Sequence, residues 1–220
     1  MTTLLLIRHG ETDYNRNGKM AGRMPGVPLN ERGRKQAAEV AEALAKAPIK
    51  TIYASPIERA QETASYLAKI IGLEIQIAEG INETDIGEWT GRSVKQCART
   101  KLWHTVIHKP SELTFPGGES FAYIQQRASA ELKAIAERHP DELVACFTHA
   151  DIIRLAVAHF LDMPLDAFQR LGSDNCSITV LHFSKEGHVS IPKINQGVSA
   201  AWPEAHEKKP RNGKVPAKPQ

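Results

Sequence analysis

The segment TTLLLIRHGET, which runs from Thr2 to Thr12, decides how this chain folds. Its first part, Thr2 to Ile7, is a short β-rich apolar run, typical of a strand that is buried on both faces of a sheet. Arg8 and His9 follow this run directly. In an open α/β sheet, ligands bind outside the carboxyl ends of the strands. The segment therefore predicts a buried strand that brings Arg8 and His9 to a ligand site.

Strand-like and helix-like segments alternate through the rest of the chain, which indicates an α/β fold with a largely parallel sheet. Hydrophobic periodicity predicts further strands at 51–54, 74–78 and 142–147, and helices at 30–47, 57–71, 121–135 and 151–161. Asn30 is a good N-cap, and Gly72 a typical helix stop. Residues 177–183 and 188–194 resemble a closing hairpin. The stretch 80–118 has little periodicity, so we expect a partly helical lid or substrate wall there.

Composition narrows the class of protein. The 220 residues are 41% hydrophobic and 24% charged, which excludes a largely disordered or fibrous chain. The longest apolar run, at 143–147, is far too short to span a membrane. The sequence does not open with a basic segment followed by an apolar stretch and a small-residue cleavage site, so secretion is not expected. The three cysteines form no CxxC pair, so we expect each to be a small buried side chain in a protein of a reducing compartment. We therefore expect a cytoplasmic protein.

The positive charge is concentrated near the C-terminus. Residues 200–220 hold five basic and two acidic residues, which account for the net charge of +3, because the remaining 23 basic and 23 acidic residues cancel. The same segment has four of the thirteen prolines. We predict one folded domain at 1–199 and a flexible basic, proline-rich tail at 200–220. So few basic residues do not indicate a nucleic-acid or membrane partner, and neither is expected.

Chemically active side chains follow two more of the predicted strands. Ser55-Pro56 leads into a helix whose first turn holds Arg59, and the strand at 142–147 leads into Thr148-His149. Guanidinium forks and helix N-termini both favour phosphate oxygens. Taken singly, an arginine at a helix start or a histidine at a strand end is more often a structural residue. Their repetition at strand ends is what predicts an oxyanion site.

Five motifs resemble those of one family. They are Leu6 to Thr12 with Asn15, Ser55 to Ala64, Ile81 to Gly91, Phe115 to Ser120 (FPGGES), and Thr148-His149. In this order they resemble the motifs of the histidine phosphatase superfamily, also called the phosphoglycerate mutase-like family, over roughly residues 3 to 183. The resemblance implies a three-layer α/β/α sandwich around a mostly parallel sheet.

The resemblance also implies a role for each matching residue. His9 is expected to be the nucleophile that forms a phosphohistidine, with its other ring nitrogen hydrogen-bonded to backbone. The residues expected to hold the phosphoryl group are Arg8, Asn15, Arg59, His149, the backbone around Ala21 and Gly22, and the backbone N–H of Ala150. No metal and no cofactor are expected.

Glu83 resembles the family's general acid, which would protonate the leaving oxygen and then activate water. That role needs a raised pKa, and we expect partial burial and a neighbouring phosphate to raise the pKa of Glu83.

Departures from the family pattern favour a phosphatase over a mutase. Gly26 stands where many relatives have Asp, and Ala150 where a glycine is common, but neither change removes a catalytic side chain. The tryptophan-containing segment and longer insert of cofactor-dependent mutases are missing around residues 23–29.

We therefore predict a metal-independent phosphomonoester hydrolase for a small phosphorylated substrate. One alternative is a phosphoglycerate mutase primed by a bisphosphorylated cofactor. A less favoured alternative is a non-catalytic phospho-ligand-binding or signalling protein, which would have no use for a nucleophile and an acid. The substrate is not predicted by the sequence, and a homo-oligomer is possible.

Overall fold

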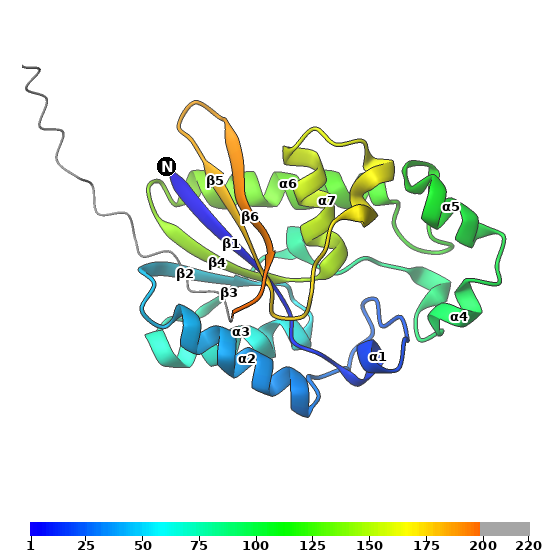
Figure 1. Cartoon of the computed structure of the whole chain (residues 1–220), viewed down its shortest axis with the longest axis horizontal. Coiled ribbons are helices and arrows are strands. Elements are labelled where there is room, and N and C mark those ends of the chain that lie inside the picture. The colour runs from blue at the N-terminus through cyan, green and yellow to red at the C-terminus, as the bar shows by residue number, and fades with distance from the viewer. Residues whose placement is uncertain (199–220) are drawn as a thin grey trace, which may run out of the picture.

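A six-stranded sheet forms the centre of the molecule (Figure 1), as seen in a computed structural model that describes residues 1–198. The strand order is β3-β2-β4-β1-β5-β6. The strands are β1 (Thr2–Arg8), β2 (Ile49–Ala54), β3 (Ile75–Ile77), β4 (Leu143–Thr148), β5 (Ile178–Phe183) and β6 (Val189–Gln196). The first four run parallel, whereas β5 and β6 form an antiparallel hairpin at one edge. The α/β fold with a mostly parallel sheet is confirmed. The predicted tail at 200–220 lies outside the described residues.

The run from Leu4 to Ile7 explains why β1 lies in the middle. All four side chains are fully buried, and β1 pairs with β4 on one side and with β5 on the other. Because successive side chains point to opposite faces of a sheet, Leu4 and Leu6 pack into one core and Leu5 and Ile7 into the other. A strand that is apolar at every position thus requires other elements to cover both faces of the sheet.

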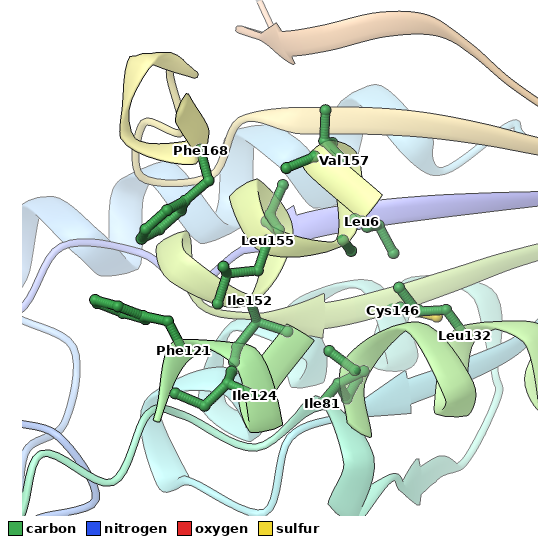
Figure 2. Packing of buried hydrophobic residues seen from close by; sticks show 14 of the residues in the cluster. Leu6, Ile81, Phe121, Ile124, Leu132, Cys146, Ile152, Leu155, Val157 and Phe168 are labelled. Atoms are coloured by element: carbon green, nitrogen blue, oxygen red, sulfur yellow. The ribbon is translucent and has the colours of Figure 1, made fainter. Parts of the chain in front are cut away.

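Two pairs of helices supply these layers (Figure 1). Helices α2 (Glu31–Leu44) and α3 (Glu58–Ile71) cover the face of Leu5, and α6 (Phe121–Arg138) and α7 (Ala150–Phe160) cover the face of Leu6. Figure 2 shows the second core, where Phe121 and Ile124 of α6 meet Ile152 and Leu155 of α7. The three-layer α/β/α sandwich is confirmed.

Local signals set the helix ends. Asn30 caps α2 by accepting a hydrogen bond from the backbone N–H of Gly33, and α3 ends before Gly72, as predicted. Helix α2 ends at Leu44, three residues short of the predicted end near Ala47. Pro48 disfavours helical backbone at Ala47, so the helix does not reach the predicted end.

The segment between β3 and α6 is irregular and partly helical, as expected. Its short helices are η1 (Glu79–Ile81), η2 (Gly87–Trp89), α4 (Val94–Cys97), α5 (Leu102–His108) and η3 (Pro110–Glu112). Two other short helices lie elsewhere, α1 (Asp13–Arg16) and η4 (Leu165–Arg170).

The three cysteines, Cys97, Cys146 and Cys176, are all buried and unpaired, as expected. No helix among residues 1–198 is both long enough and apolar enough to cross a membrane.

Candidate active site

The carboxyl ends of β1, β2 and β4 converge on one cavity. Backbone hydrogen bonds continue past these strands, from His9 N–H to Thr148 C=O and from Ser55 N–H to Phe147 C=O, both at 2.9 Å. They hold the three loops side by side. The cavity has a volume of about 150 Å³. The predicted site residues that line it are Arg8, His9, Asn15, Ala21, Gly22, Arg59, Glu83 and Ala150. His149, the remaining one, is fully buried and is not among the residues that line the cavity.

A larger cavity, of about 380 Å³, lies at the opposite end of the sheet. It is bounded by Met1, Lys133 and Phe183 and contains none of the predicted site residues. The predicted site residues therefore gather at the smaller cavity, where the strand ends converge.

His9 is held in one protonation state. Its Nδ1 lies 2.7 Å from the carbonyl oxygen of Gly10, and its Nε2 lies 3.2 Å from Nε of Arg59. A carbonyl can only accept and a guanidinium can only donate, so the proton is on Nδ1 and the lone pair is on Nε2. Burial, followed by the charges of Arg59, His149 and Arg8, holds the pKa of His9 well below 6.5. The result is a neutral imidazole whose unprotonated nitrogen, Nε2, accepts a hydrogen bond from Arg59.

Arg59 lies at the centre of the site although its side chain is only 2% exposed. It donates from one terminal nitrogen to the carbonyl of Gly22 at 2.9 Å and to Oε2 of Glu83 at 3.1 Å. Its other terminal nitrogen is buried and has no hydrogen-bond partner among the described residues. Unpaired buried donors are rare and call for an explanation, and a ligand oxygen would provide one.

Arg8 presents a second such donor. One terminal nitrogen donates to the carbonyl of Ser173 at 2.6 Å, whereas Nε is buried without a partner in the described part of the chain. Burial lowers the pKa of Arg8, although Glu83 opposes this, and the guanidinium remains charged. Arg8 and Arg59 therefore bring two positive charges to the same small cavity, and each keeps one buried guanidinium nitrogen without a partner among the described residues.

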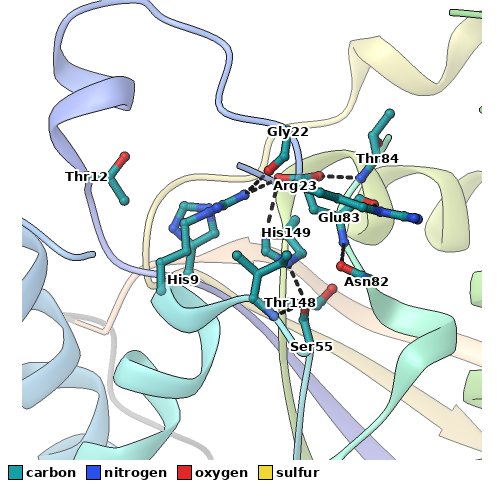
Figure 3. A network of polar contacts seen from close by, with 12 residues as sticks. His9, Thr12, Gly22, Arg23, Ser55, Asn82, Glu83, Thr84, Thr148 and His149 are labelled. Atoms are coloured by element: carbon teal, nitrogen blue, oxygen red, sulfur yellow. Dashed lines mark hydrogen bonds and ion pairs between the residues drawn. The ribbon is translucent and has the colours of Figure 1, made fainter. Parts of the chain in front are cut away.

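Glu83 differs from the expectation. Burial alone would raise its pKa, but His149, Arg59 and the backbone N–H of Thr84 outweigh burial and lower the pKa well below its ordinary value. The Oε2 atom lies 3.2 Å from Nδ1 of His149, and Oε1 accepts from Thr84 N–H at 2.9 Å (Figure 3). The predicted rise in pKa is thus wrong for this arrangement of side chains, because contacts with His149, Arg59 and the Thr84 N–H stabilise the carboxylate.

His149 occupies the N-cap position of α7, where its side chain makes no capping hydrogen bond, and links the strand ends instead. Its Nε2 lies 2.7 Å from the hydroxyl of Ser55, while Nδ1 faces Glu83 (Figure 3). Burial lowers the pKa of His149, although the charge of Glu83 opposes this. Ser55 thus has a site contact that the sequence did not predict, although the Ser55-Pro56 motif marked its position.

Asn15 is held by the loop that follows His9. It lies in the short helix α1, and Thr12 caps this helix by accepting from the backbone N–H of Asn15. The side-chain oxygen of Asn15 in turn accepts from the N–H and the hydroxyl of Thr12, at 3.1 and 3.0 Å. With its oxygen occupied by Thr12, Asn15 keeps the amide NH₂ as its donor for a ligand in the cavity it lines.

Lys19 and Asp151 also line the cavity, and the sequence did not select them. Asp151 follows the second-histidine motif by two residues, so its position was available as a signal. Burial raises its pKa, Glu83 adds to the rise, and Arg154 and Arg8 oppose it. Lys19 lies in an irregular loop where no pattern marks it.

The ligand atoms of His9, Glu83 and His149 lie within 4.8 Å of one another, a grouping that a metal ion could use. Arg59, however, already donates to Nε2 of His9 and to Oε2 of Glu83. The positive charge of Arg59, held against the atoms that would bind a cation, disfavours a metal ion there.

Comparison with known proteins agrees with this arrangement. The model of the histidine phosphatase superfamily (branch 1) matches residues 4–196. The chain is 32% identical to phosphoserine phosphatase 1 of Hydrogenobacter thermophilus over 200 residues, which cover 89% of this chain and 92% of that protein. It is 30% identical to a 2,3-bisphosphoglycerate-dependent phosphoglycerate mutase of Thermoplasma acidophilum, over 82% of this chain and 87% of that one.

Among solved structures, a phosphoserine phosphatase from Entamoeba histolytica in complex with 3-phosphoglyceric acid superimposes with a TM-score of 0.80. The two sequences are 28% identical, and the match covers 89% of this chain and 98% of the other.

Proposed function

This chain belongs to the histidine phosphatase superfamily, and we propose that it is a metal-independent phosphomonoester hydrolase that acts through a phosphohistidine on His9. The observation that carries the proposal is the state of His9. It is a buried, neutral imidazole whose unprotonated Nε2 is held by Arg59, in a cavity that is also lined by Arg8 and where both guanidinium groups keep a nitrogen without a partner among the described residues. A nucleophile surrounded by fixed positive charge suits attack on an anionic phosphoryl group.

In the first step the lone pair on His9 Nε2 attacks phosphorus and forms a P–N bond. The P–O bond to the leaving group breaks, and its electron pair stays on the oxygen. A carboxyl proton of Glu83 passes to that oxygen, so the product leaves as an alcohol. Arg8, Arg59, Asn15 and the Ala150 N–H would hold the other phosphoryl oxygens, whereas His149, whose ring nitrogens face Ser55 and Glu83, would hold Glu83 in place.

In the second step water attacks the phosphohistidine, and Glu83 accepts its proton. The P–N bond breaks, the electron pair returns to Nε2, and inorganic phosphate is released. Dividing one displacement into two steps gives each step a well-placed nucleophile.

The first step requires a proton that Glu83 does not hold by itself, because its pKa is lowered. We propose that the proton arrives on the substrate, which binds as the monoanion. The added negative charge of the phosphoryl group raises the pKa of Glu83 in the complex and so favours proton transfer to it.

Small phosphorylated metabolites are the proposed substrates. The relatives support this, since one is named a phosphoserine phosphatase and another is bound to 3-phosphoglyceric acid. The test is phosphate release from a panel that includes phosphoserine and 3-phosphoglycerate, with and without EDTA. Hydrolysis that EDTA leaves unchanged supports the proposal, and activity lost to EDTA and restored by a metal ion contradicts it.

A mutase remains the second candidate because the chain is also similar to a phosphoglycerate mutase. A mutase returns the phosphoryl group to a second hydroxyl and needs a bisphosphorylated primer. Adding 2,3-bisphosphoglycerate and following the conversion of 3- to 2-phosphoglycerate distinguishes the two activities. We expect phosphate release to exceed isomerisation.

A further inference from the structure

A partly buried carboxylate outside the reacting groups, that of Glu119, connects two arginines. Its Oε1 accepts from Arg23 at 2.8 Å and from Nε of Arg127 at 3.1 Å. Its Oε2 accepts from a terminal nitrogen of Arg127 and from the backbone N–H of Asp85, both at 3.0 Å. The Arg127 contact is a two-point pairing of guanidinium and carboxylate, which fixes orientation as well as distance. We call Arg23, Glu119 and Arg127 the Glu119 cluster.

Both arginines of the Glu119 cluster also bind the backbone of the segment that carries Glu83. Nε of Arg23 donates to the Glu83 carbonyl at 2.8 Å, and Arg127 donates to the same carbonyl at 3.1 Å. Arg127 further donates to the carbonyls of Gly80 and Asn82, both at 2.8 Å. Figure 3 shows Arg23 beside Glu83 and Asn82. The backbone carbonyl of Glu83 therefore accepts hydrogen bonds from two guanidinium groups, directly next to the Glu83 side chain.

The FPGGES motif completes the arrangement from the other side. The backbone N–H of Glu119 donates to the carbonyl of Asp85 at 2.9 Å. A β-carbon on Gly118 would lie 2.3 Å from that same carbonyl, and one on Gly87 would lie 2.1 Å from the carbonyl of Pro116. The two loops thus approach each other closely enough only because both positions are glycine.

The segment that carries Glu83 needs such support. Residues 82–86 have no helical or strand structure, so no regular ladder of hydrogen bonds holds them. The carboxylate of Glu83 must nevertheless meet a leaving oxygen, and an error of about 1 Å in such a group costs on the order of 10²-fold in rate. The contacts of the Glu119 cluster take the place of the missing ladder.

From these contacts we infer that Arg23, Glu119 and Arg127 are positioning residues for the general acid, which act by fixing the backbone of Glu83. The inference rests on the proposed role of Glu83 in the reaction. It also gives the FPGGES motif a function, because Gly118 and Glu119 of this motif support the segment that carries Glu83 without taking part in the reaction.

The primary test compares Arg127→Lys with Arg138→Lys. Lysine keeps the charge at 127 but cannot bind two partners in a fixed fork. Arg138 lies on the same helix and pairs with Glu131 at 3.0 Å on the exposed face, so it controls for the loss of an ion pair. We expect Arg127→Lys to lower kcat for an alkyl phosphate about 10- to 100-fold with KM within about threefold. Arg138→Lys should match wild type.

The leaving group separates positioning from general damage. Nitrophenyl phosphate expels a weakly basic phenolate that needs little help from an acid, so Arg127→Lys should form its phosphoenzyme nearly as fast as wild type. Equal losses in the rate of phosphoenzyme formation with the alkyl and the nitrophenyl phosphate would overturn the inference. If Arg127→Lys does not fold, Arg23→Lys and Glu119→Gln provide the same comparison, since Arg23 is partly exposed.

A double-mutant cycle makes the test independent of the size of the effect. In a Glu83→Gln background there is no acid left to position, so Arg127→Lys should cause no further loss. The same fold-loss in both backgrounds would contradict the inference. If instead Glu83→Gln alone slows phosphoenzyme formation equally with both substrates, the proposed acid itself is wrong, and that failure is distinguishable from failure of the positioning role.

Discussion

Arg59 donates a hydrogen bond from Nε to Nε2 of His9 over 3.2 Å, deep inside the protein. The same guanidinium also binds Oε2 of Glu83 at 3.1 Å, so one side chain sets the distance between the proposed nucleophile and the proposed acid. In this position it covers the Nε2 lone pair. A bound phosphoryl group would draw the guanidinium onto its oxygens and leave Nε2 free to attack.

Replacing Arg59 by Lys should therefore impair more than substrate binding. Lysine keeps a positive charge but cannot bind His9, Gly22 and Glu83 together. We expect kcat/KM to fall about 10²- to 10³-fold, the usual cost of losing a preorganised donor to a developing charge. Steady-state kinetics with phosphoserine measures this. Arg34→Lys, which alters a partly exposed pair with Glu62, is the control and should be unaffected.

The lowered pKa of Glu83 has a consequence for pH dependence. If the free enzyme holds Glu83 ionised, the reaction must start from the substrate monoanion. The fraction of monoanion falls about tenfold per pH unit above the second pKa of the phosphate ester, about 6. We expect kcat/KM for phosphoserine to follow that decline between about pH 6 and 8.

The acid side of the same profile tests His9. Because burial and Arg59 hold the pKa of His9 well below 6.5, the nucleophile stays neutral, and no decline is expected on going from pH 7 to 6. A profile that is flat from pH 6 to 8 would show that Glu83 is protonated in the free enzyme, and it would contradict the proposed delivery of the proton by the substrate.

His9→Ala should abolish turnover and leave the fold intact. The imidazole is buried, but its two hydrogen bonds join it only to Gly10 and Arg59, both within the site. We expect a melting temperature within a few degrees of wild type and retained binding of phosphoserine by calorimetry. Residual hydrolysis above about one part in 10³ would point to another nucleophile.

Gly118→Ala should disturb the site from a distance. The new methyl group would meet the carbonyl of Asp85 at 2.3 Å, and the loops must separate to accept it. Overpacking of this kind costs about 1–3 kcal/mol, measurable by urea unfolding. Gly197→Ala, where nothing lies within 4 Å, is the matched control. If the Glu119 cluster positions Glu83, Gly118→Ala should also lower kcat for alkyl phosphates.

The sheet and its layers were predictable because they follow from local patterns. A strand that is apolar at every position, such as Leu4 to Ile7, must lie inside a parallel sheet, and its end then places Arg8 and His9. The predicted site residues converge because β1, β2 and β4 are neighbours in the sheet. That adjacency follows from the fold and not from any spacing in the sequence.

Two features could not be read from the sequence. The pKa of Glu83 depends on whether burial or contact with Arg59 and His149 dominates, and this is decided by distances near 3 Å. The pairing of Arg23 with Glu119 joins residues 96 positions apart, both in irregular segments where periodicity carries no information. Propensity describes helices and strands, whereas these contacts arise from how loops meet.

The central claim, a covalent phosphohistidine on His9, is tested most directly by trapping the intermediate. The enzyme is mixed with a radiolabelled phosphomonoester, quenched in alkali within milliseconds and digested, and the labelled peptide is sequenced by mass spectrometry. We predict a burst of label close to one per active site, attached to His9, stable in alkali and lost in acid, and absent from His9→Ala. Turnover without any burst of label, or label that persists in His9→Ala, would contradict a covalent role for His9.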